Sequence, residues 1–563
     1  MKKPVLLLWL LAATALFAAD FAAEGKLWWA HIQFLADDKL EGRDTGSAGF
    51  GKAVEYVSGQ FQHMGLKPAG TVGYLQPVKF ETRQLVAAES SLAVVRDGKA
   101  EPLEAADASL SSRSEAAGSV EAPMVFVGYG MVVPEAHYDD LQGLDLKGKI
   151  AVYLGAQGPV QASNNVKSHF SSGAERWAAL HRAGAIGVAT IPSPRGPGAG
   201  AGRGAAADAA GANAAGAGAD AAAAGRGGRG AAGGGGRGAG GPQPPSFFLA
   251  DPALQETAGQ AAAITITARG FAKFFEGTGH TLAELQKLAQ DNQPLPRFPL
   301  PVTLRATVTE KRAAVEAPNV AGLFPGSGKL KQEYVIMSAH LDHLGIGRPV
   351  NGDSIYNGAM DDASGIASVL EIARLLKASG HKLKRSVIFL AVTAEEKGEL
   401  GSRYFAAHPT VPGDRIVADI NLDMFLPLYP LKVIEVQGLS ESTLGDTVRA
   451  AAKAQGVDVQ VDQEPDQNRF IRSDQYSFIR RGIPALAFKF GYEPGSPEMK
   501  IRQDWVRNIY HKPADDLNQP VDAAAAARFD RIILDLIERV ANDPARPHWN
   551  SDSFFSRFAT PSM

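Results

Sequence analysis

Residues 334–396 read YVIMSAHLDHLGIGRPVNGDSIYNGAMDDASGIASVLEIARLLKASGHKLKRSVIFLAVTAEE. The fold class can be predicted from the pattern of this segment. It begins with an apolar run at Tyr334 and ends with a second run from Val387, both typical of buried strands. Between them, apolar residues recur at helical spacing from Ser364 to Ser379, and Gly380 ends that pattern. A strand, a helix and a second strand in this order predict a parallel βαβ unit.

Three further strand candidates continue this rhythm: IVADINLDM from Ile416, VIEVQG from Val433 and PALAFKFG from Pro484. The alternation predicts an α/β domain over residues 293–545, with a doubly wound, mostly parallel sheet between helical layers (α/β/α). Residues 24–100 are helical in part and are expected to form the N-terminal part of the same domain. Residues 546–563 are interpreted as a C-terminal tail.

A different pattern precedes that domain. The segments APMVFVGYGM from Ala122 and KGKIAVYLGA from Lys147 are short apolar runs bounded by glycine, which is typical of buried strands. Together with one helix at AERWAALHR they predict a β-rich module over residues 105–290, inserted into the α/β domain. Residues 196–243 are dominated by Gly and Ala and are expected to be a disordered insertion. The Pro-rich stretch from Gln293 is expected to be a rigid linker.

The first 20 residues have the form of a secretory signal peptide, with Lys2 and Lys3 before an uncharged apolar run. The run is short for a spanning helix, so a membrane anchor is the weaker interpretation. The net charge of −3 argues against a nucleic-acid binder, and the absence of cysteine excludes thiol chemistry and disulfides. We therefore expect a secreted or periplasmic bacterial protein whose metal ligands, if any, are His, Asp and Glu.

Acidic and histidine side chains lie just beyond the predicted strands: His340, Asp361, Glu395 with Glu396, and Asp423. The carboxyl ends of parallel strands form the ligand site of such sheets, so these residues should converge. Their types suit two divalent ions such as zinc, with an aspartate between the ions and His511 as a second histidine. Either glutamate then remains as a base. Such a site is equipped to hydrolyse an amide or ester.

The ordered motifs SAHLDHLG, YNGAMDDASGIASVLEIAR, AVTAEEKGELGSRYF, NLDM and YHKPADD resemble those of the co-catalytic dizinc metallopeptidases. This family includes secreted bacterial aminopeptidases, glutamate carboxypeptidases and transferrin receptors. The segments HIQFLADDKLEGRDTGSAG and QFQHMGLKPAG resemble the leader segment of its exported aminopeptidase branch. FVGYG and LDLKGKIAVYLG resemble the protease-associated (PA) domain that this branch inserts.

The resemblance implies a role for each matching residue. Asp361 would bridge two zinc ions. His340 and Asp423 would complete one site, Glu396 and His511 the other, and Glu395 would be the general base. Asp342 would orient His340 as an outer partner of the metal. The resemblance also implies a cis peptide bond between Asp361 and Asp362.

Two departures from the family pattern concern the surroundings of the site. Met360 stands where many members have an aspartate, and RSDQ at 472–475 stands where relatives often have Ser-Asp-His. Arg472, Asp474 and Tyr476 are therefore candidates for the substrate pocket. His343 is expected near the site but not as a ligand.

The function that the resemblance implies is that of an exported dizinc aminopeptidase, which acts on peptides and binds no nucleic acid. A carboxypeptidase of the same fold stays an alternative because Arg472, Arg480 and Arg481 could hold a terminal carboxylate. A non-catalytic PA-domain receptor and a single-zinc glutaminyl cyclase are further alternatives.

Overall fold

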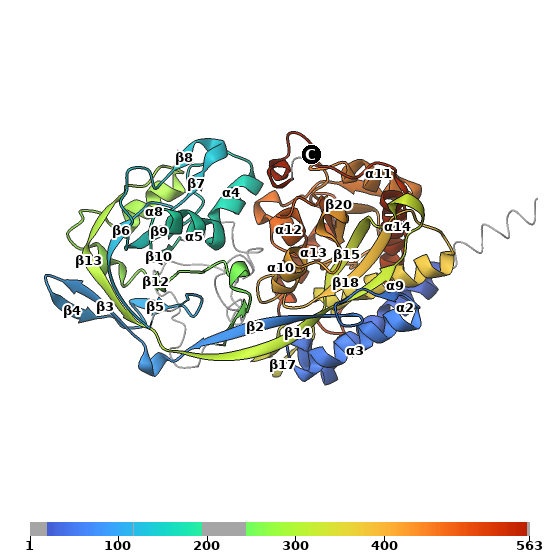
Figure 1. Ribbon diagram of the computed structural model, residues 1–563, viewed down its shortest axis with the longest axis horizontal. Coiled ribbons are helices and arrows are strands. Elements are labelled where there is room, and N and C mark those ends of the chain that lie inside the picture. Colours follow the sequence, from blue (N-terminus) through green and yellow to red (C-terminus); the bar gives the residue numbers. More distant parts are fainter. Residues whose placement is uncertain (1–19, 116–117, 194–243, 560–563) are drawn as a thin grey trace, which may run out of the picture. The chain divides into compact units, whose positions relative to one another are not determined.

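The computed structural model describes residues 20–115, 118–193 and 244–559. The chain divides into two compact units, of which the first comprises residues up to Val78 together with those from Glu316 onward. The second unit, Lys79–Val315, is inserted between these two parts. Figure 1 shows the strands and helices of each unit. The predicted leader at 1–20 and the Gly/Ala tract at 196–243 fall almost entirely outside the described residues.

The first unit is built on one mixed sheet whose centre is parallel. The sheet follows the order β11-β2-β14-β18-β15-β19-β22-β20-β21, in which β11 (Ser246–Leu249) and most of β2 (Leu75–Leu85) belong to the inserted residues, and β1 pairs with β14. The parallel centre consists of β18, β15, β19 and β22, while β14 and β20 run antiparallel to their central neighbours. The bounds are β1 Lys67–Pro68, β14 Glu310–Phe324, β15 Tyr334–His340, β18 Ser386–Val392, β19 Ile416–Asn421, β20 Val433–Gln437, β21 Asp458–Gln460 and β22 Ala485–Phe490.

The central strands are buried, apart from Tyr334 at the start of β15, because helices cover them. One group of helices comprises α2, α9, α11 and α14, which contact one another, and α9 also packs on β15 and β18. A second pair, α10 and α12, packs together, and α12 contacts β19 and β22. The helices of this unit are α2 Asp20–Leu35, α3 Ala48–His63, α9 Ser364–Ser379, α10 Leu400–Ala407, α11 Leu444–Ala454, α12 Gln475–Ile479, α13 Pro497–Asn508 and α14 Ala523–Asn542.

The strand order places a topological switch point at β15. From β15 the chain passes through α9 to β18 on one side, and it then continues through α10 to β19 on the other side of β15. Ligand sites of open α/β sheets lie at such a point, outside the carboxyl ends of the strands. His340 is the last residue of β15 and therefore stands at this position.

The second unit contains an eight-stranded sheet in the order β4-β3-β13-β6-β9-β10-β12-β5. Its core includes Val125, Trp177, Leu180 and Val188. The strands are β3 Ser91–Arg96, β4 Lys99–Pro102, β5 Ala108–Leu110, β6 Ser119–Phe126, β9 Ile150–Gly155, β10 Gly187–Pro192, β12 Ala262–Ile266 and β13 Phe298–Thr307. The helices are α4 Asn164–Ser171, α5 Gly173–Arg182, α7 Phe271–Phe275 and α8 Leu282–Gln290. The chain passes between the units within β2 (Leu75–Leu85) and β14.

The structure confirms the mixed α/β fold and all five strands expected in the α/β domain, as well as the helix over Ser364–Ser379. It differs at the edges of the inserted module, where we expected 105–290. Residues 79–100 belong to the second unit, because β3 pairs with both β13 and β4. The expected linker from Gln293 is in part a strand, since β13 begins at Phe298. Its prolines concealed the strand pattern, because proline cannot donate a ladder hydrogen bond, and the register shifts between Pro299 and Thr303.

Among the described residues, no helix combines the length and the apolar character needed to cross a membrane.

Candidate metal centre

The centre of the site is the turn Ala359–Ala363 directly before α9, which carries Asp361. The Asp361–Asp362 peptide bond is cis, as the family resemblance implied. Asp515 holds this turn from another loop, because its carboxylate accepts the backbone N–H groups of Met360 at 2.9 Å and Asp361 at 3.0 Å. The Asp361 carboxylate is thereby fixed at the carboxyl end of β15.

The first side of the site consists of His340 and Asp423. His340 Nε2 lies 3.1 Å from Asp361 Oδ1 and 3.8 Å from Asp423 Oδ1. Asp423 follows the end of β19 and is held by Ser473, whose hydroxyl donates to Asp423 Oδ2 at 2.6 Å. Lys489 Nζ donates to the Asp423 carbonyl at 2.7 Å. Two strand ends and the turn therefore meet at one place.

The second side consists of Glu396 and His511. His511 Nε2 lies 3.0 Å from Asp361 Oδ2, the other oxygen of the same carboxylate. It also lies 3.3 Å from Glu396 Oε1. The structure thus brings together all five residues that were expected to hold metal, and each oxygen of Asp361 faces a different histidine. This is the arrangement that a carboxylate between two cations requires.

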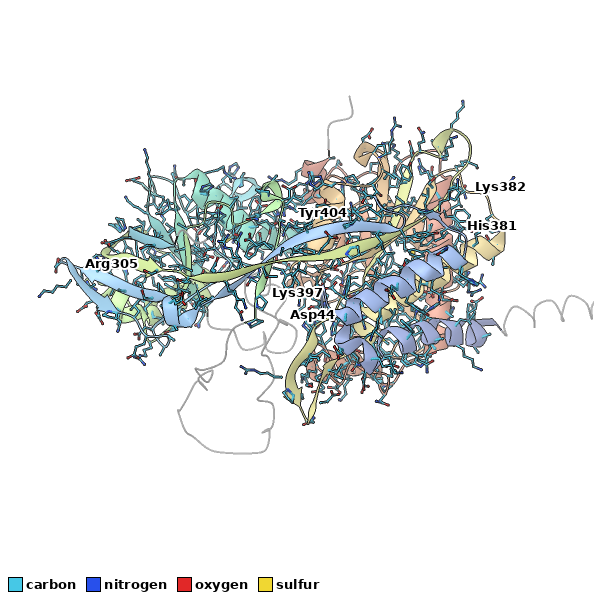
Figure 2. All side chains as sticks on the ribbon, turned by 60° about the horizontal axis from the view of Figure 1, so that its bottom comes forward. Asp44, Arg305, His381, Lys382, Lys397 and Tyr404 are labelled. Atoms are coloured by element: carbon cyan, nitrogen blue, oxygen red, sulfur yellow. The ribbon has the colours of Figure 1, made fainter. Side chains whose placement is uncertain are left out.

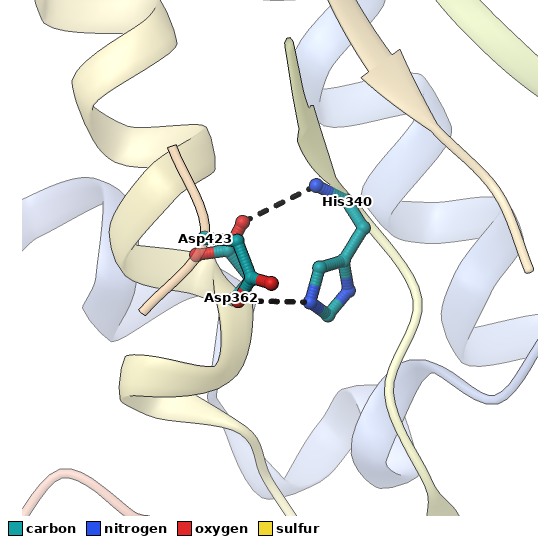
Figure 3. Close-up of side chains that lie close together, drawn as sticks. All are labelled: His340, Asp362 and Asp423. Carbon is teal, nitrogen blue, oxygen red and sulfur yellow. Dashed lines mark hydrogen bonds and ion pairs between the residues drawn. The ribbon is translucent and has the colours of Figure 1, made fainter. Parts of the chain in front are cut away.

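The side chain of Asp362, the neighbour of Asp361, binds main-chain N–H groups. Figure 3 shows its side chain beside His340 and Asp423. Its Oδ2 accepts the His340 backbone N–H at 3.2 Å, and its Oδ1 accepts those of Gly365 at 2.9 Å and Met424 at 3.2 Å. These bonds tie the strand end to the start of α9. Asp362 is close enough to join His340 and Asp423 at a cation, but its oxygens are already engaged by the main chain.

Asp342 differs from its expected contact. His340 Nδ1 lies 3.0 Å from the main-chain carbonyl of Asp342, so the backbone and not the carboxylate orients the imidazole. The carboxylate instead accepts the Glu395 backbone N–H at 3.1 Å and the Thr45 hydroxyl at 3.0 Å. Asp342 therefore positions the main chain of Glu395. The sequence could not distinguish these roles because both place Asp342 beside His340.

Burial and neighbouring carboxylates set the protonation of Glu395. Burial raises the pKa of this carboxyl well above its ordinary value, although the charge of His340 opposes the shift. The carboxylates of Glu396, Asp474 and Asp423 raise that pKa further. A raised pKa makes this carboxylate a stronger base toward a water proton, as a general base requires.

Contacts within the cluster shift the pKa values of Asp361 and His511 in opposite directions. Burial raises the pKa of Asp361, but contacts with His340 and His511 hold that pKa well below its usual range. Burial lowers the pKa of His511, yet the Glu396 charge and the Asp361 contact raise it to about 10. The cluster thus stabilises positive charge at both histidines. Divalent cations can replace these protons.

The three expected pocket residues do not share one position. Asp474 is fully buried directly before α12, and the carboxylates of Glu399 and Asp423 raise its pKa in addition to burial. Arg472 is half-buried and donates to the Gln467 carbonyl at 3.0 Å. Tyr476 instead packs against an apolar cluster that includes Phe470 and Trp549. The structure therefore places Asp474 beside the site, and Tyr476 in this apolar packing.

The N-terminal segment contributes residues that the sequence did not single out. Arg43 is buried, and Asp44 forms an ion pair with Lys397 at 2.6 Å, next to Glu396 (Figure 2). This ion pair joins positions about 350 residues apart in the chain, which no local pattern indicates. Asp515 was missed as well, whereas His343 lies near the site, as expected, 2.8 Å from Glu396 Oε1. The first Asp of YHKPADD was the available signal for Asp515, and the second His of HLDH was the signal for His343.

The donor set fits zinc. Asp361 Oδ2 and Glu396 Oε1 are buried and lack an aligned hydrogen-bond partner among the described residues, which is costly unless a cation lies between them. Two histidines and three carboxylates are ligands that zinc accepts at nitrogen and oxygen distances. The residues present therefore fit one cation on each side of Asp361.

Comparison with known proteins agrees with this site. Residues 319–537 match Peptidase family M28. The aminopeptidase from Aneurinibacillus sp. strain AM-1 has the same fold, with a TM-score of 0.50 and 21% identity over 93% of this chain and 95% of that chain. The residues that match this family, 319–537, include His340, Asp361, Glu396, Asp423 and His511.

Two curated relatives extend the comparison. A probable zinc metalloprotease of Pyrenophora teres f. teres is 26% identical over 306 residues, which cover 48% of this chain and 58% of that protein. A probable leucine aminopeptidase 2 of Aspergillus oryzae is 32% identical over 164 residues, covering 28% of this chain and 31% of that protein. The chain thus spans about half the length, or less, of these relatives.

Proposed function

We propose that this protein is a zinc-dependent aminopeptidase that removes N-terminal residues from peptides. The observation that carries the proposal is the position of Asp361, whose two carboxylate oxygens face His340 at 3.1 Å and His511 at 3.0 Å. A carboxylate in this position can serve two cations at once. The match to peptidase family M28 and the relatives named as aminopeptidases support the same activity.

Each side of Asp361 would hold one zinc ion. His340 and Asp423 complete one set of ligands, and Glu396 and His511 complete the other. When bound, zinc acts as a Lewis acid that polarises the scissile carbonyl and lowers the pKa of a water molecule.

Glu395 would move the proton in this reaction. Its backbone is fixed by the hydrogen bond to Asp342, and burial with nearby carboxylates raises its pKa. Glu395 takes a proton from the attacking water and delivers it to the leaving amine. The same carboxyl group would act as base toward the water and then as acid toward the leaving amine, and the upward direction of its pKa shift supports the second role.

The excess of carboxylates favours an amine over a carboxylate at the end of the substrate. Asp474 is fully buried, and its charge acts on Glu395. The Asp474 carboxyl group is not needed to hold metal and is therefore available to the terminal amino group of the substrate. Arg480 and Arg481, which could have bound a terminal carboxylate, are exposed at the far end of α12.

We further propose that the enzyme is exported and that the unit Lys79–Val315 is a PA-type insertion. The signal-like sequence at 1–20 supports export. The insertion of a sheet-rich unit between β2 and β14 supports the second proposal.

The test is mass spectrometry of a peptide pool in which each sequence is present with a free and with an acetylated N-terminus. We expect the zinc-loaded full chain to remove single N-terminal residues from the free peptides only, and a chelator to stop the reaction. Shortening from the C-terminus would replace the proposal by a carboxypeptidase. Absence of cleavage by a zinc-loaded protein would favour a non-catalytic binding function.

A further inference from the structure

His343 lies in the loop after β15, three residues beyond His340, and its side chain is fully buried. Its Nδ1 is 2.8 Å from Glu396 Oε1 and 3.8 Å from Asp361 Oδ2. Its ring meets the ring of His511 edge-on, with centroids 5.8 Å apart. His343 therefore faces the same two carboxylate oxygens as His511 does.

The ring is held in this position by close packing with the main chain. A Cβ atom on Gly358, which has φ +65°, would come within 2.5 Å of the His343 ring. Only glycine leaves room for the imidazole at this point of the turn before Asp361.

Three atoms that meet here have no aligned hydrogen-bond partner among the residues that the structure describes. They are His343 Nδ1, Asp361 Oδ2 and Glu396 Oε1, and all three are buried. Hydrogen bonds normally satisfy buried polar atoms, so convergence of three unsatisfied ones calls for another kind of partner. The same three residues form a group whose ligand atoms are close enough to share one cation.

The distances among the ligand atoms fit one tetrahedral zinc ion. His511 Nε2, His343 Nδ1, Asp361 Oδ2 and Glu396 Oε1 are separated by 2.8, 3.0, 3.3 and 3.8 Å in the four pairs measured. Ligands at zinc bond lengths of about 2.0–2.1 Å lie about 3.3 Å apart at the corners of a tetrahedron. Among the described residues, the other side of Asp361 offers Asp361 itself, His340 and Asp423, since the oxygens of Asp362 accept main-chain hydrogen bonds. His340 Nε2 is 3.1 Å from the Asp361 oxygen and 3.8 Å from the Asp423 oxygen.

We propose that His343 is the fourth protein ligand of the metal held by Asp361, Glu396 and His511. The two metal sites are then unequal. The site with His343 is closed by four protein ligands, as in structural zinc sites, and the site with His340 and Asp423 keeps a position for water or substrate. The inference rests on the metal binding of the proposed function but not on its peptidase activity.

The test is zinc-edge X-ray absorption of the zinc-loaded full chain and of His343→Ala, with zinc content measured on the same samples. Three imidazoles on two zinc ions give about 1.5 imidazoles per zinc, and loss of His343 lowers this to about 1.0. The control is His169→Ala, which removes a buried histidine of the second unit and should leave the count unchanged. A wild-type count of about 1.0 that His343→Ala does not lower would overturn the proposal.

A second measurement covers the case in which His343→Ala does not fold. Anomalous scattering from a crystal of the zinc-loaded wild-type protein locates each ion directly. The proposal requires an ion about 2.0–2.1 Å from His343 Nδ1, and an ion bonded only to Asp361, Glu396 and His511 contradicts it. A chain without peptidase activity but with His343 bonded to zinc would refute the proposed function and leave this inference intact.

Discussion

Arg43 Nε donates a hydrogen bond to the carbonyl of Leu341 at 3.0 Å, so a residue of the N-terminal segment holds the main chain directly after His340. Its other donors reach the carbonyls of Leu35 at 2.6 Å, Asn357 at 2.6 Å and Gly358 at 3.1 Å. Asn357 and Gly358 directly precede the turn that carries Asp361. One buried guanidinium therefore fixes the backbone after β15 and directly before the turn that carries the central carboxylate.

Replacing Arg43 by Lys should destabilise the protein although the charge is kept. A lysine cannot reach four carbonyls in different directions, and each buried carbonyl left without a partner costs about 1–3 kcal/mol. We expect the free energy of unfolding to fall by at least about 3 kcal/mol in urea titrations. The control is Arg348→Lys in the exposed strand β16 (Gly345–Val350), which should leave the free energy of unfolding unchanged. If Arg43→Lys were as stable as this control, the role of Arg43 would be contradicted.

Glu395→Gln should retain zinc and lose turnover. The amide keeps the shape of the side chain, and the bond to Asp342 comes from the backbone of residue 395. The amide cannot accept a proton, so kcat should fall by about 10²–10⁴-fold. Zinc content measured on the same preparation separates this effect from loss of metal. A variant with wild-type kcat would remove Glu395 from the proton transfer.

Removing zinc should lower the melting temperature, because buried carboxylates then lose the cations that stabilise them. A ligand present at 100 times its Kd stabilises the folded state by about 2.7 kcal/mol per site. We expect a chelator to lower Tm and added zinc to restore it. Asp361→Asn, which removes the central charge, should respond much less to either treatment. An identical response in this variant would argue against Asp361 as a shared ligand.

Asp419 should make stability depend on pH. It lies inside β19, fully buried, and accepts the Ser338 hydroxyl at 2.8 Å. Burial raises the pKa of Asp419 to about 8. The folded state then binds one proton more than the unfolded state between about pH 4 and pH 8, so the free energy of unfolding falls as the pH rises through this range.

Asp419→Asn mimics the protonated carboxyl and should remove this slope. We expect a gain of about 2–5 kcal/mol at pH 8 and almost none at pH 4, measured in urea titrations relative to the wild type at each pH. A gain that is the same at both pH values would show that the carboxyl does not titrate in this range.

Much of the fold and of the metal centre could be predicted from the sequence, because both depend on local patterns. Buried strands are continuous apolar runs, and the carboxyl ends of parallel strands must meet, so His340 and Asp423 were found by their positions. The sequence could not indicate contacts such as that of Arg43 with Leu341. It also could not show that the Asp342 carboxylate faces Glu395, or that His343 faces Glu396. Side-chain directions repeat regularly in strands and helices, but they do not repeat in a loop.

The most direct test of the two-metal account is a zinc titration of the metal-free full chain, with bound zinc and the hydrolysis of a free-amine peptide measured together. We predict that activity is absent without zinc and reaches its maximum when about two zinc ions are bound per chain. Full activity without zinc, or a maximum with one ion bound, would contradict the account of Asp361 as a carboxylate shared by two metals.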